Sequence, residues 1–357
     1  MTKVRIRIIF LLTTFMMLAP ISAVAVDVAS GQDNKQRENY SKREEVRQFA
    51  EELAKSEGFT AEGLLYVLGQ AEYKQSIIDA ISRPAERTLT WSKYQDIFLT
   101  SRRISDGQKF MFDNAKALET AYKKYGVPPV IVTAIIGVET MYGRHRGNYR
   151  VLDALATLAF DYPPRSKFFK KELKEFILLV REENQDITDL KGSYAGAMGY
   201  GQFIPSSYRH YSVDFDGDGV RDIWNNKTDA IGSVANYFAR HGWREGEEVV
   251  TRINPEVDVE GSIFNVSLKP SSTIGELAEL GIIVNMELAG TTKVSPMKLI
   301  GKEGDEYWLG LHNFYVITRY NHSKLYAMAI FQLSEALRNA NIIASAVIES
   351  SQELASN

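Results

Sequence analysis

Apolar residues recur at helical spacing through the first part of the chain, and this pattern predicts a succession of helices. Val46, Ala50 and Leu53 lie on one face, and Gly58 is expected to end their helix. A second helix should begin near Thr60, which is a typical N-cap residue. Further helices are expected around 76–81, 94–99, 106–125, 151–160 and 166–183. The apolar stretch 323–340 predicts a core helix that returns the chain to the α part.

From Glu248 onward the pattern changes to short runs in which apolar and polar residues alternate. We interpret these runs as strands of a small antiparallel sheet. Within this part, Thr273 and Glu276 form a capping-box pattern that predicts a short helix over 273–280. The expected fold is therefore α+β, mainly α, with a small antiparallel β domain. The runs are EVVTRI, SIFNVSL, GIIVNMEL, MKLIG, EYWLG and FYVITRY.

The segment Pro128–Gly143 is almost wholly apolar and contains a single acid, Glu139. On a helical wheel this acid lies at the margin of an apolar stripe, so it should face a core or the wall of a cleft. A buried carboxylate without a partner tends to keep its proton near neutral pH, which suits a general acid. The alternative is an acid paired with a buried arginine or with backbone amides. The segment by itself leaves both open.

Composition and charge narrow the class of protein. A chain of 357 residues can form two or three subdomains, and its net charge of −3 gives no basic field for nucleic acid. Lys3, Arg5 and Arg7 precede an apolar run and the small residues that end at Ala25, as in a secretory signal peptide over 1–25. A membrane anchor is the alternative, but the run is short for a spanning helix. With no cysteine in the sequence, neither disulfides nor a lipid-acceptor thiol are available.

An acidic loop predicts a calcium site. Asp214, Asp216 and Asp218 occupy positions 1, 3 and 5 of an EF-hand-like loop, with Gly219 at position 6. Val220 would contribute its carbonyl oxygen. Position 12 is Asn225 instead of the usual glutamate, so Asp229 is expected to close the site, and Asp222 could join directly or through water. Oxygen ligands favour Ca²⁺ in a structural role, whereas the alternative is an acidic turn without metal.

A glycine-rich stretch over 191–205 precedes this loop. So many glycines allow the backbone to approach a ligand closely, and Ser193, Tyr200 and Gln202 offer hydrogen bonds and aromatic surface. The stretch lacks the ending of a phosphate-binding loop, which argues against nucleotide binding. A tight turn between helices is the alternative interpretation.

Taken together, these motifs resemble the membrane-bound lytic murein transglycosylase B family. The resemblance covers nearly all of the mature chain and implies a lysozyme-like catalytic core, an all-α domain, a small β domain and a calcium site. It also implies the domains: an α domain over 41–126 completed by 323–350, the core over 127–247, and the β domain over 248–322. The polar residues 26–40, which lack periodicity, are expected to form a flexible linker before them. The motifs are Ile136–Thr140, Gly192–Gly199, Gly201–Phe203, Ala230–Tyr237 after the acidic loop, and Arg319–Ser323.

The resemblance implies non-hydrolytic cleavage of the β-1,4 bond between N-acetylmuramic acid and N-acetylglucosamine in peptidoglycan, with a 1,6-anhydromuramyl product. Glu139 would be both acid and base, no cofactor would take part in catalysis, and the substrate's N-acetyl group would replace a second carboxylate. Ser193 and Gln202 would hold the substrate near the scissile bond. The other residues with implied substrate contacts are Tyr94, Arg165, Tyr200, Tyr320, Asn321 and Tyr326.

The sequence departs from the family pattern after Asp161-Tyr162-Pro163, where Pro164-Arg165 leaves one arginine instead of two, and Phe168 replaces a tyrosine. These changes concern contacts with peptide stems and distal sugars. A hydrolytic muramidase and a non-catalytic, calcium-stabilised glycan-binding protein are the alternative functions. The expected partners are glycan strands and cell-wall enzyme complexes, and the expected location is the periplasm, without an intrinsic membrane anchor.

Overall fold

The computed structural model describes residues 39–83, 89–253, 261–284 and 286–356. The predicted signal peptide and most of the linker therefore lie outside the described residues. Tyr40 is buried and its hydroxyl donates to Asp161 over 2.6 Å. By its contacts the chain divides into two compact units, residues 39–83 with 146–210, and residues 89–145 with 211–356. The predicted domain boundaries stay a prediction.

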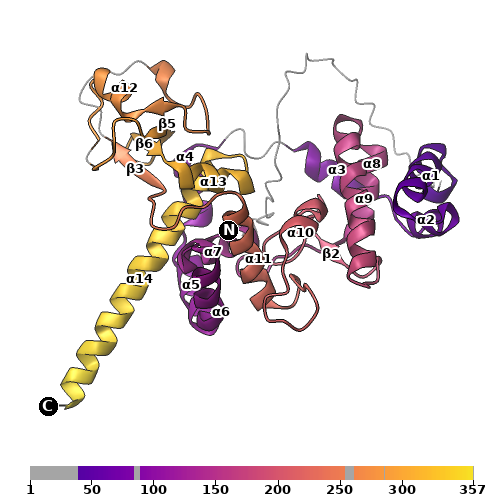
Figure 1. The fold of residues 1–357 in the computed structure, drawn as a ribbon, viewed down its shortest axis with the longest axis horizontal. Helices are drawn as coiled ribbons and strands as arrows, with labels where there is room; N and C mark the ends of the chain where they lie inside the picture. Colours follow the sequence, from indigo (N-terminus) through magenta and orange to yellow (C-terminus); the bar gives the residue numbers. More distant parts are fainter. Residues whose placement is uncertain (1–38, 84–88, 254–260, 285, 357) are drawn as a thin grey trace, which may run out of the picture. The chain divides into compact units, whose positions relative to one another are not determined.

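The unit formed by residues 39–83 and 146–210 is mainly helical. Thr60 caps α2 by accepting a hydrogen bond from the Gly63 amide, as predicted. Helices α8 and α9 lie side by side (Figure 1). The elements are η1 (Tyr40–Lys42), α1 (Glu44–Glu57), α2 (Ala61–Leu68), α3 (Gln75–Ser82), β1 (Tyr149–Arg150), α8 (Val151–Asp161), η2 (Pro163–Arg165), α9 (Ser166–Glu182), β2 (Lys191–Gly192) and α10 (Pro205–Tyr211).

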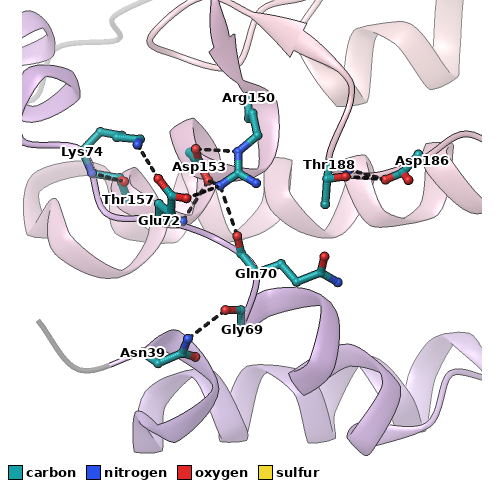
Figure 2. A network of polar contacts seen from close by, with 10 residues as sticks. All are labelled: Asn39, Gly69, Gln70, Glu72, Lys74, Arg150, Asp153, Thr157, Asp186 and Thr188. Carbon is teal, nitrogen blue, oxygen red and sulfur yellow. Dashed lines mark hydrogen bonds and ion pairs between the residues drawn. The ribbon is translucent and has the colours of Figure 1, made fainter.

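A polar network connects the segment after α2 to the start of α8 (Figure 2). The Arg150 guanidinium donates to the Gln70 carbonyl at 3.2 Å and to the Asp153 carboxylate at 2.8 Å. Asp153 in turn accepts the Glu72 amide at 2.8 Å, although its own side chain is almost completely buried. Because each buried polar group has a partner, the network holds residues far apart in sequence without leaving an unpaired charge.

The unit formed by residues 89–145 and 211–356 contains the predicted core helix and the sheet. Helix α7 packs against α5, α6, α11 and α14. Within the described ranges, no helix is apolar over enough length to cross a membrane. The elements are α4 (Trp91–Phe98), α5 (Ser101–Asp113), α6 (Ala115–Tyr125), α7 (Pro129–Thr140), α11 (Lys227–Arg240), β3 (Val250–Ile253), η3 (Gly261–Ile263), β4 (Ser272–Thr273), α12 (Ile274–Glu279), β5 (Lys293–Ile300), β6 (Asp305–Gly310), α13 (His312–Tyr320) and α14 (Lys324–Ser356).

The sheet has the strand order β3-β6-β5-β4, and all neighbouring strands are antiparallel. The predicted capping box at the start of α12 is present, with Thr273 and Glu276 bonded reciprocally. One side of this small module is apolar and forms its own core. The fully buried members of that core are Ile253, Phe264, Leu277, Ile282, Val294, Leu309 and Leu311.

Some element predictions are wrong. The single helix expected over 106–125 is two helices that meet at Asn114, whose side chain donates to the Phe110 carbonyl and ends α5. The run FYVITRY is part of helix α13 and not a strand. There the buried amide of Asn313 donates to the Arg244 and Glu247 carbonyls, and this tertiary contact outweighs the β-propensity of a short apolar run.

The runs SIFNVSL and GIIVNMEL also form no strand in the residues described. Asn265 has a left-handed backbone, with φ of 62°, and its side chain bonds to the backbone of Lys298 in β5. Gly281 is left-handed as well, and beyond it Ile282 is buried while Ile283 is exposed. These residues cover the apolar side of the sheet as loops, because left-handed residues interrupt an extended chain.

Candidate active site

Helix α7 is buried along its length and carries Glu139 in its last turn. Pro129 begins the helix, where a missing amide hydrogen has no cost, and every residue from Val130 to Thr140 is buried. The sequence predicted an apolar stripe on one face. In the structure all faces of α7 are buried, not one alone, because four helices surround it. Glu139 itself keeps 8% of its surface exposed.

Tyr326, from the first turn of α14, is a hydrogen-bond partner of Glu139. Its hydroxyl donates to Glu139 Oε1 over 2.6 Å, and the tyrosine is 1% exposed. The distance is typical of a strong bond between a hydroxyl and a carboxylate. The sequence left open whether Glu139 is unpaired or is paired with an arginine or with backbone amides, and in the structure it accepts a hydrogen bond from a phenol.

The surroundings keep the nearby phenols protonated. Burial, followed by the negative charge of Glu139, raises the pKa of Tyr320 and of Tyr326 well above the ordinary value. Tyr94, in α4, is buried close enough to Tyr326 to add to the increase in its pKa. Asn321 follows Tyr320 at the end of α13 and is also buried. The structure thus gathers Glu139 and these four predicted residues in one unit.

The chain leaves α7 through a strained turn. Met141 and Tyr142 both have left-handed backbones, with φ of 51° and 59°. The Tyr142 hydroxyl donates to the Arg103 carbonyl, and the Arg103 guanidinium donates to the Gly137 carbonyl, two residues before Glu139. Such conformations cost about 1–3 kcal/mol each and persist where the surroundings enforce them. Arg103 and Tyr142 therefore fix the turn that carries Glu139.

Gly137→Ala is expected to destabilise the protein and reduce its activity. A Cβ at Gly137 would lie 2.6 Å from the Tyr142 hydroxyl oxygen, so the ring must move. We expect a loss of about 1–3 kcal/mol in the free energy of unfolding, typical of overpacking, although alanine is the better helix former. Urea unfolding measures this change. Gly290→Ala is the control, because open space surrounds Gly290; equal stability of the two variants would contradict the prediction.

Sequence reasoning missed Tyr237 as a candidate site residue. Its ring packs against Tyr320 at 4.7 Å between centroids, and its hydroxyl donates to the Arg319 carbonyl. His241, one helical turn later, stacks on the same ring at 4.0 Å. The signal was present as an aromatic pair with a spacing of four residues on α11, which places both on one face.

Ser193 belongs to the other unit, where the glycine-rich loop begins. It is buried, and its Oγ accepts the amides of Ala195 and Ala197 at 3.3 and 3.0 Å. The loop is tight because Gly147 approaches the Gly192 carbonyl so closely that a Cβ would lie 2.0 Å from the oxygen. Because a hydroxyl can accept two bonds and donate one, Ser193 keeps a donor after organising this turn.

Gln202 is the most unusual residue of that loop. Its backbone is left-handed, with φ of 53°, and its Nε2 donates to the Gly199 and Arg146 carbonyls. Its Oε1 is buried and has no hydrogen-bond partner among the residues that the structure describes. A buried acceptor without a donor is costly, so this atom is suited to a ligand that donates. Tyr200 is buried nearby in the loop, with the Arg146 guanidinium 5.1 Å from its ring centre.

Arg165 lies in η2 of the same unit and is partly buried. Its guanidinium is 4.4 Å from the centre of the Phe168 ring, which is a cation–π contact. Burial lowers the pKa of Arg165. The phenylalanine that departs from the family pattern thus packs against the remaining arginine.

The acidic loop brings together the four carboxylates predicted to bind a cation. Oxygens of Asp214, Asp216, Asp218 and Asp229 lie within 4.8 Å of one another. Asp229 is fully buried and accepts the Phe215 and Asp222 amides at 2.7 and 2.8 Å. This set of oxygen donors fits a hard divalent cation.

The other predicted metal-site residues have different surroundings. The Asp222 carboxylate accepts the amides of Trp224 and Asn225, and Asp222 is not a member of the cluster. Val220 is exposed, and its amide donates to Asp218.

The chain matches the family model "Transglycosylase SLT domain" over residues 41–335. It is 41% identical over 313 residues to membrane-bound lytic murein transglycosylase B of Escherichia coli, with 85% of each chain covered.

Solved structures of lytic transglycosylases are similar along most of the chain. Catenated SltB1 from Pseudomonas aeruginosa is 50% identical with a TM-score of 0.82, over 84% of this chain and 99% of that one. Escherichia coli Slt35 in complex with calcium is 42% identical with a TM-score of 0.76, covering 83% and 93%. SltB3 from Pseudomonas aeruginosa with NAG-anhNAM-pentapeptide is 31% identical with a TM-score of 0.73, covering 83% and 79%.

These similarities and the mainly helical fold with small antiparallel sheets define a transglycosylase. The chain belongs to the lytic murein transglycosylase B family, and it is an enzyme with lytic transglycosylase activity on peptidoglycan.

Proposed function

We propose that Glu139 performs both proton transfers of the reaction. As an acid it protonates the glycosidic oxygen while the bond from that oxygen to C1 of the muramyl residue breaks. As a base it then takes the proton of the C6 hydroxyl as the oxygen of that group bonds to C1. The ring closes without water, and the carboxyl group ends in its starting state. The observation that supports this role is the pair of Glu139 and Tyr326 at the end of a buried helix.

Tyr326 acts as a positioning residue in this proposal. Because its hydroxyl donates to Oε1, the carboxyl group is held in one orientation, and we assign the transferred proton to Oε2. Tyr94, Tyr320 and Asn321 would contact the sugar next to the broken bond. The raised pKa of Tyr320 keeps its hydroxyl a donor at any working pH.

Four residues of the other unit are proposed substrate contacts within that unit. The unpaired Oε1 of Gln202 would accept a hydrogen bond from a sugar hydroxyl or an amide. Ser193 would donate its remaining hydrogen, and Tyr200, with the Arg146 guanidinium over its ring, would contact the substrate beside it. Arg165 would contact an anionic group of a peptide stem, with its planar side chain held against Phe168.

We further propose that the acidic loop binds Ca²⁺. The ligands would be the carboxylates of Asp214, Asp216, Asp218 and Asp229 with the carbonyl of Val220. Bound there, the ion would neutralise clustered negative charge and fix the loop before α11; it takes no part in the proton transfers. Slt35, the relative solved with calcium, supports the choice of ion.

The proposed location is the periplasm, because the sequence begins like a signal peptide and the substrate is the cell wall. Glycan strands are the proposed partner, together with other cell-wall enzymes.

Mass spectrometry of the digested products distinguishes this reaction from hydrolysis. With purified sacculi and the full mature chain, we expect muropeptides that end in 1,6-anhydromuramic acid and are lighter by one water than hydrolytic products. Digestion in H₂¹⁸O adds a second readout, since ring closure incorporates no solvent oxygen. Reducing ends labelled with ¹⁸O as the main product would contradict the proposal in favour of a muramidase.

A further inference from the structure

A cavity of about 370 Å³ lies between the β module and the start of α14. Its walls include Lys269, Tyr315, His322 and Lys324, and no carboxylate side chain lines it among the described residues. A second cavity, of about 960 Å³, shares Lys269 and Tyr315 with the first. The two cavities therefore meet at these residues, and all of their walls belong to one unit.

The second cavity is lined by side chains of both signs. Lys269 and Lys293 contribute cations, and Glu248 and Glu287 contribute carboxylates. Arg244 and Glu247, also in the wall, pair with each other at 3.3 Å. An anion is thus favoured in the smaller cavity, whereas the larger one suits a ligand with mixed charge.

Lys324 lies where a positive charge is unfavourable. It is the first residue of α14, where the helix dipole favours negative charge. Its side chain is half-buried, and burial lowers its pKa. Within the part of the chain that the structure describes, neither Lys324 nor Lys269 forms an ion pair. Lys269 is exposed, so the cost of burial concerns Lys324 alone: partly burying its cation without a partner costs free energy, which an anionic ligand would offset.

The smaller cavity adjoins the segment that carries the Glu139 surroundings. In the stretch from residue 320 to residue 326, Tyr320 and Tyr326 face Glu139. His322 and Lys324 alternate with them along the chain and line the cavity instead. A molecule in the cavity is therefore connected to the candidate active site through a few residues of backbone.

We propose that this cavity binds a carboxylate of the peptide attached to the glycan strand, with Lys324 and Lys269 as its cationic contacts. The inference rests on the proposed function, because it assigns a second part of the same substrate. A peptide supplies carboxylates for the smaller cavity and further polar groups of both signs for the larger one. SltB3, a relative solved with a pentapeptide-bearing fragment, supports a peptide as the occupant.

Calorimetric titration of the full mature chain with the free pentapeptide tests the proposal without any turnover. The peptide with free carboxyl groups should bind about tenfold more tightly than the same peptide with every carboxyl group amidated, as expected for one charge-assisted hydrogen bond. Lys324→Met should reduce this difference most and Lys269→Met should reduce it less, while the part that Arg165 contributes should remain. Lys116→Met, which removes an exposed lysine of α6, should keep it. Thermal unfolding shows whether Lys324→Met is folded. If it is not, the titration of Lys269→Met tests the proposal instead.

Equal binding of the two peptides to the unaltered protein, or an unchanged difference in both lysine variants, would overturn the proposal. A second arm compares kcat/KM on peptide-bearing strands with kcat/KM on strands stripped by an amidase. Lys324→Met should lower that ratio by about tenfold. An active Glu139→Gln variant would refute the proposed acid/base while leaving the peptide-binding result intact, so the two failures are distinguishable.

Discussion

Glu139→Gln is expected to lower the rate of anhydromuropeptide release by about 10²–10⁴-fold, the usual contribution of a general acid or base. Glutamine has the same shape but carries no transferable proton on an oxygen. The amide can still accept the Tyr326 hydrogen bond, which in the unaltered protein spans 2.6 Å, so the fold should persist. Chromatography of digested sacculi measures the rate, and cosedimentation with sacculi should show unchanged binding.

Glu172→Gln is the matched control, because it also replaces a buried helical glutamate. Glu172 accepts the amide and hydroxyl of Ser206 and is 2% exposed. Its replacement should cost stability and leave the chemistry intact. Tyr326→Phe keeps Glu139 and removes only its hydrogen-bond donor, so its rate of anhydromuropeptide release should lie between those of Glu139→Gln and Glu172→Gln. Turnover of Glu139→Gln close to that of the unaltered protein would exclude the assigned role.

Removal of Ca²⁺ by a chelator is expected to lower the melting temperature by about 5 °C or more. A ligand present at 100 times its Kd stabilises a folded protein by about 2.7 kcal/mol, and about 2–4 °C correspond to each kcal/mol in a domain of about 150–250 residues, the size of the unit that carries the loop. The reason is local, because Asp214, Asp216, Asp218 and Asp229 repel one another without a cation. Differential scanning calorimetry with chelator and with added Ca²⁺ measures the shift.

Two variants separate metal binding from other effects of the chelator. Asp229→Asn removes a buried ligand and should abolish the response, whereas Asp222→Asn should keep it, because Asp222 caps local amides outside the cluster. If melting is the same with and without chelator in the unaltered protein, the acidic loop does not bind calcium in the folded state. Rates of anhydromuropeptide release should change less than stability does, since the ion takes no part in the proton transfers.

Local patterns were enough to predict most helices and the acidic loop. A helix start such as Thr60 or Thr273 is determined by a side chain that bonds to an amide three residues away, and this information lies within a few positions. The cluster of aspartates is local too, apart from Asp229, because alternate residues of one loop converge on the same point. The segment around Glu139 was recognisable as one acid in an apolar run.

Contacts between distant residues decided what the local patterns left open. By their local pattern, the runs FYVITRY and GIIVNMEL fit a strand as well as any other element. The buried amide of Asn313 favours the helix that contains FYVITRY. Packing over the core of the sheet favours the loop conformation of the described residues of GIIVNMEL. Likewise the turn after α7 depends on Arg103, more than thirty residues away. Short apolar runs contain too little information to exclude the alternatives.

The sequence by itself determined that Glu139 is a lone acid in a buried helix, that the aspartates gather in one acidic loop, and that the chain is mainly helical. Only the tertiary structure decided that Tyr326 donates to Glu139, and that Lys324 lines a cavity and forms no ion pair with any residue that the structure describes. The physical reason is that hydrophobic periodicity and capping act within one or two turns. The choice of a hydrogen-bond partner 187 residues away depends on how separate helices pack.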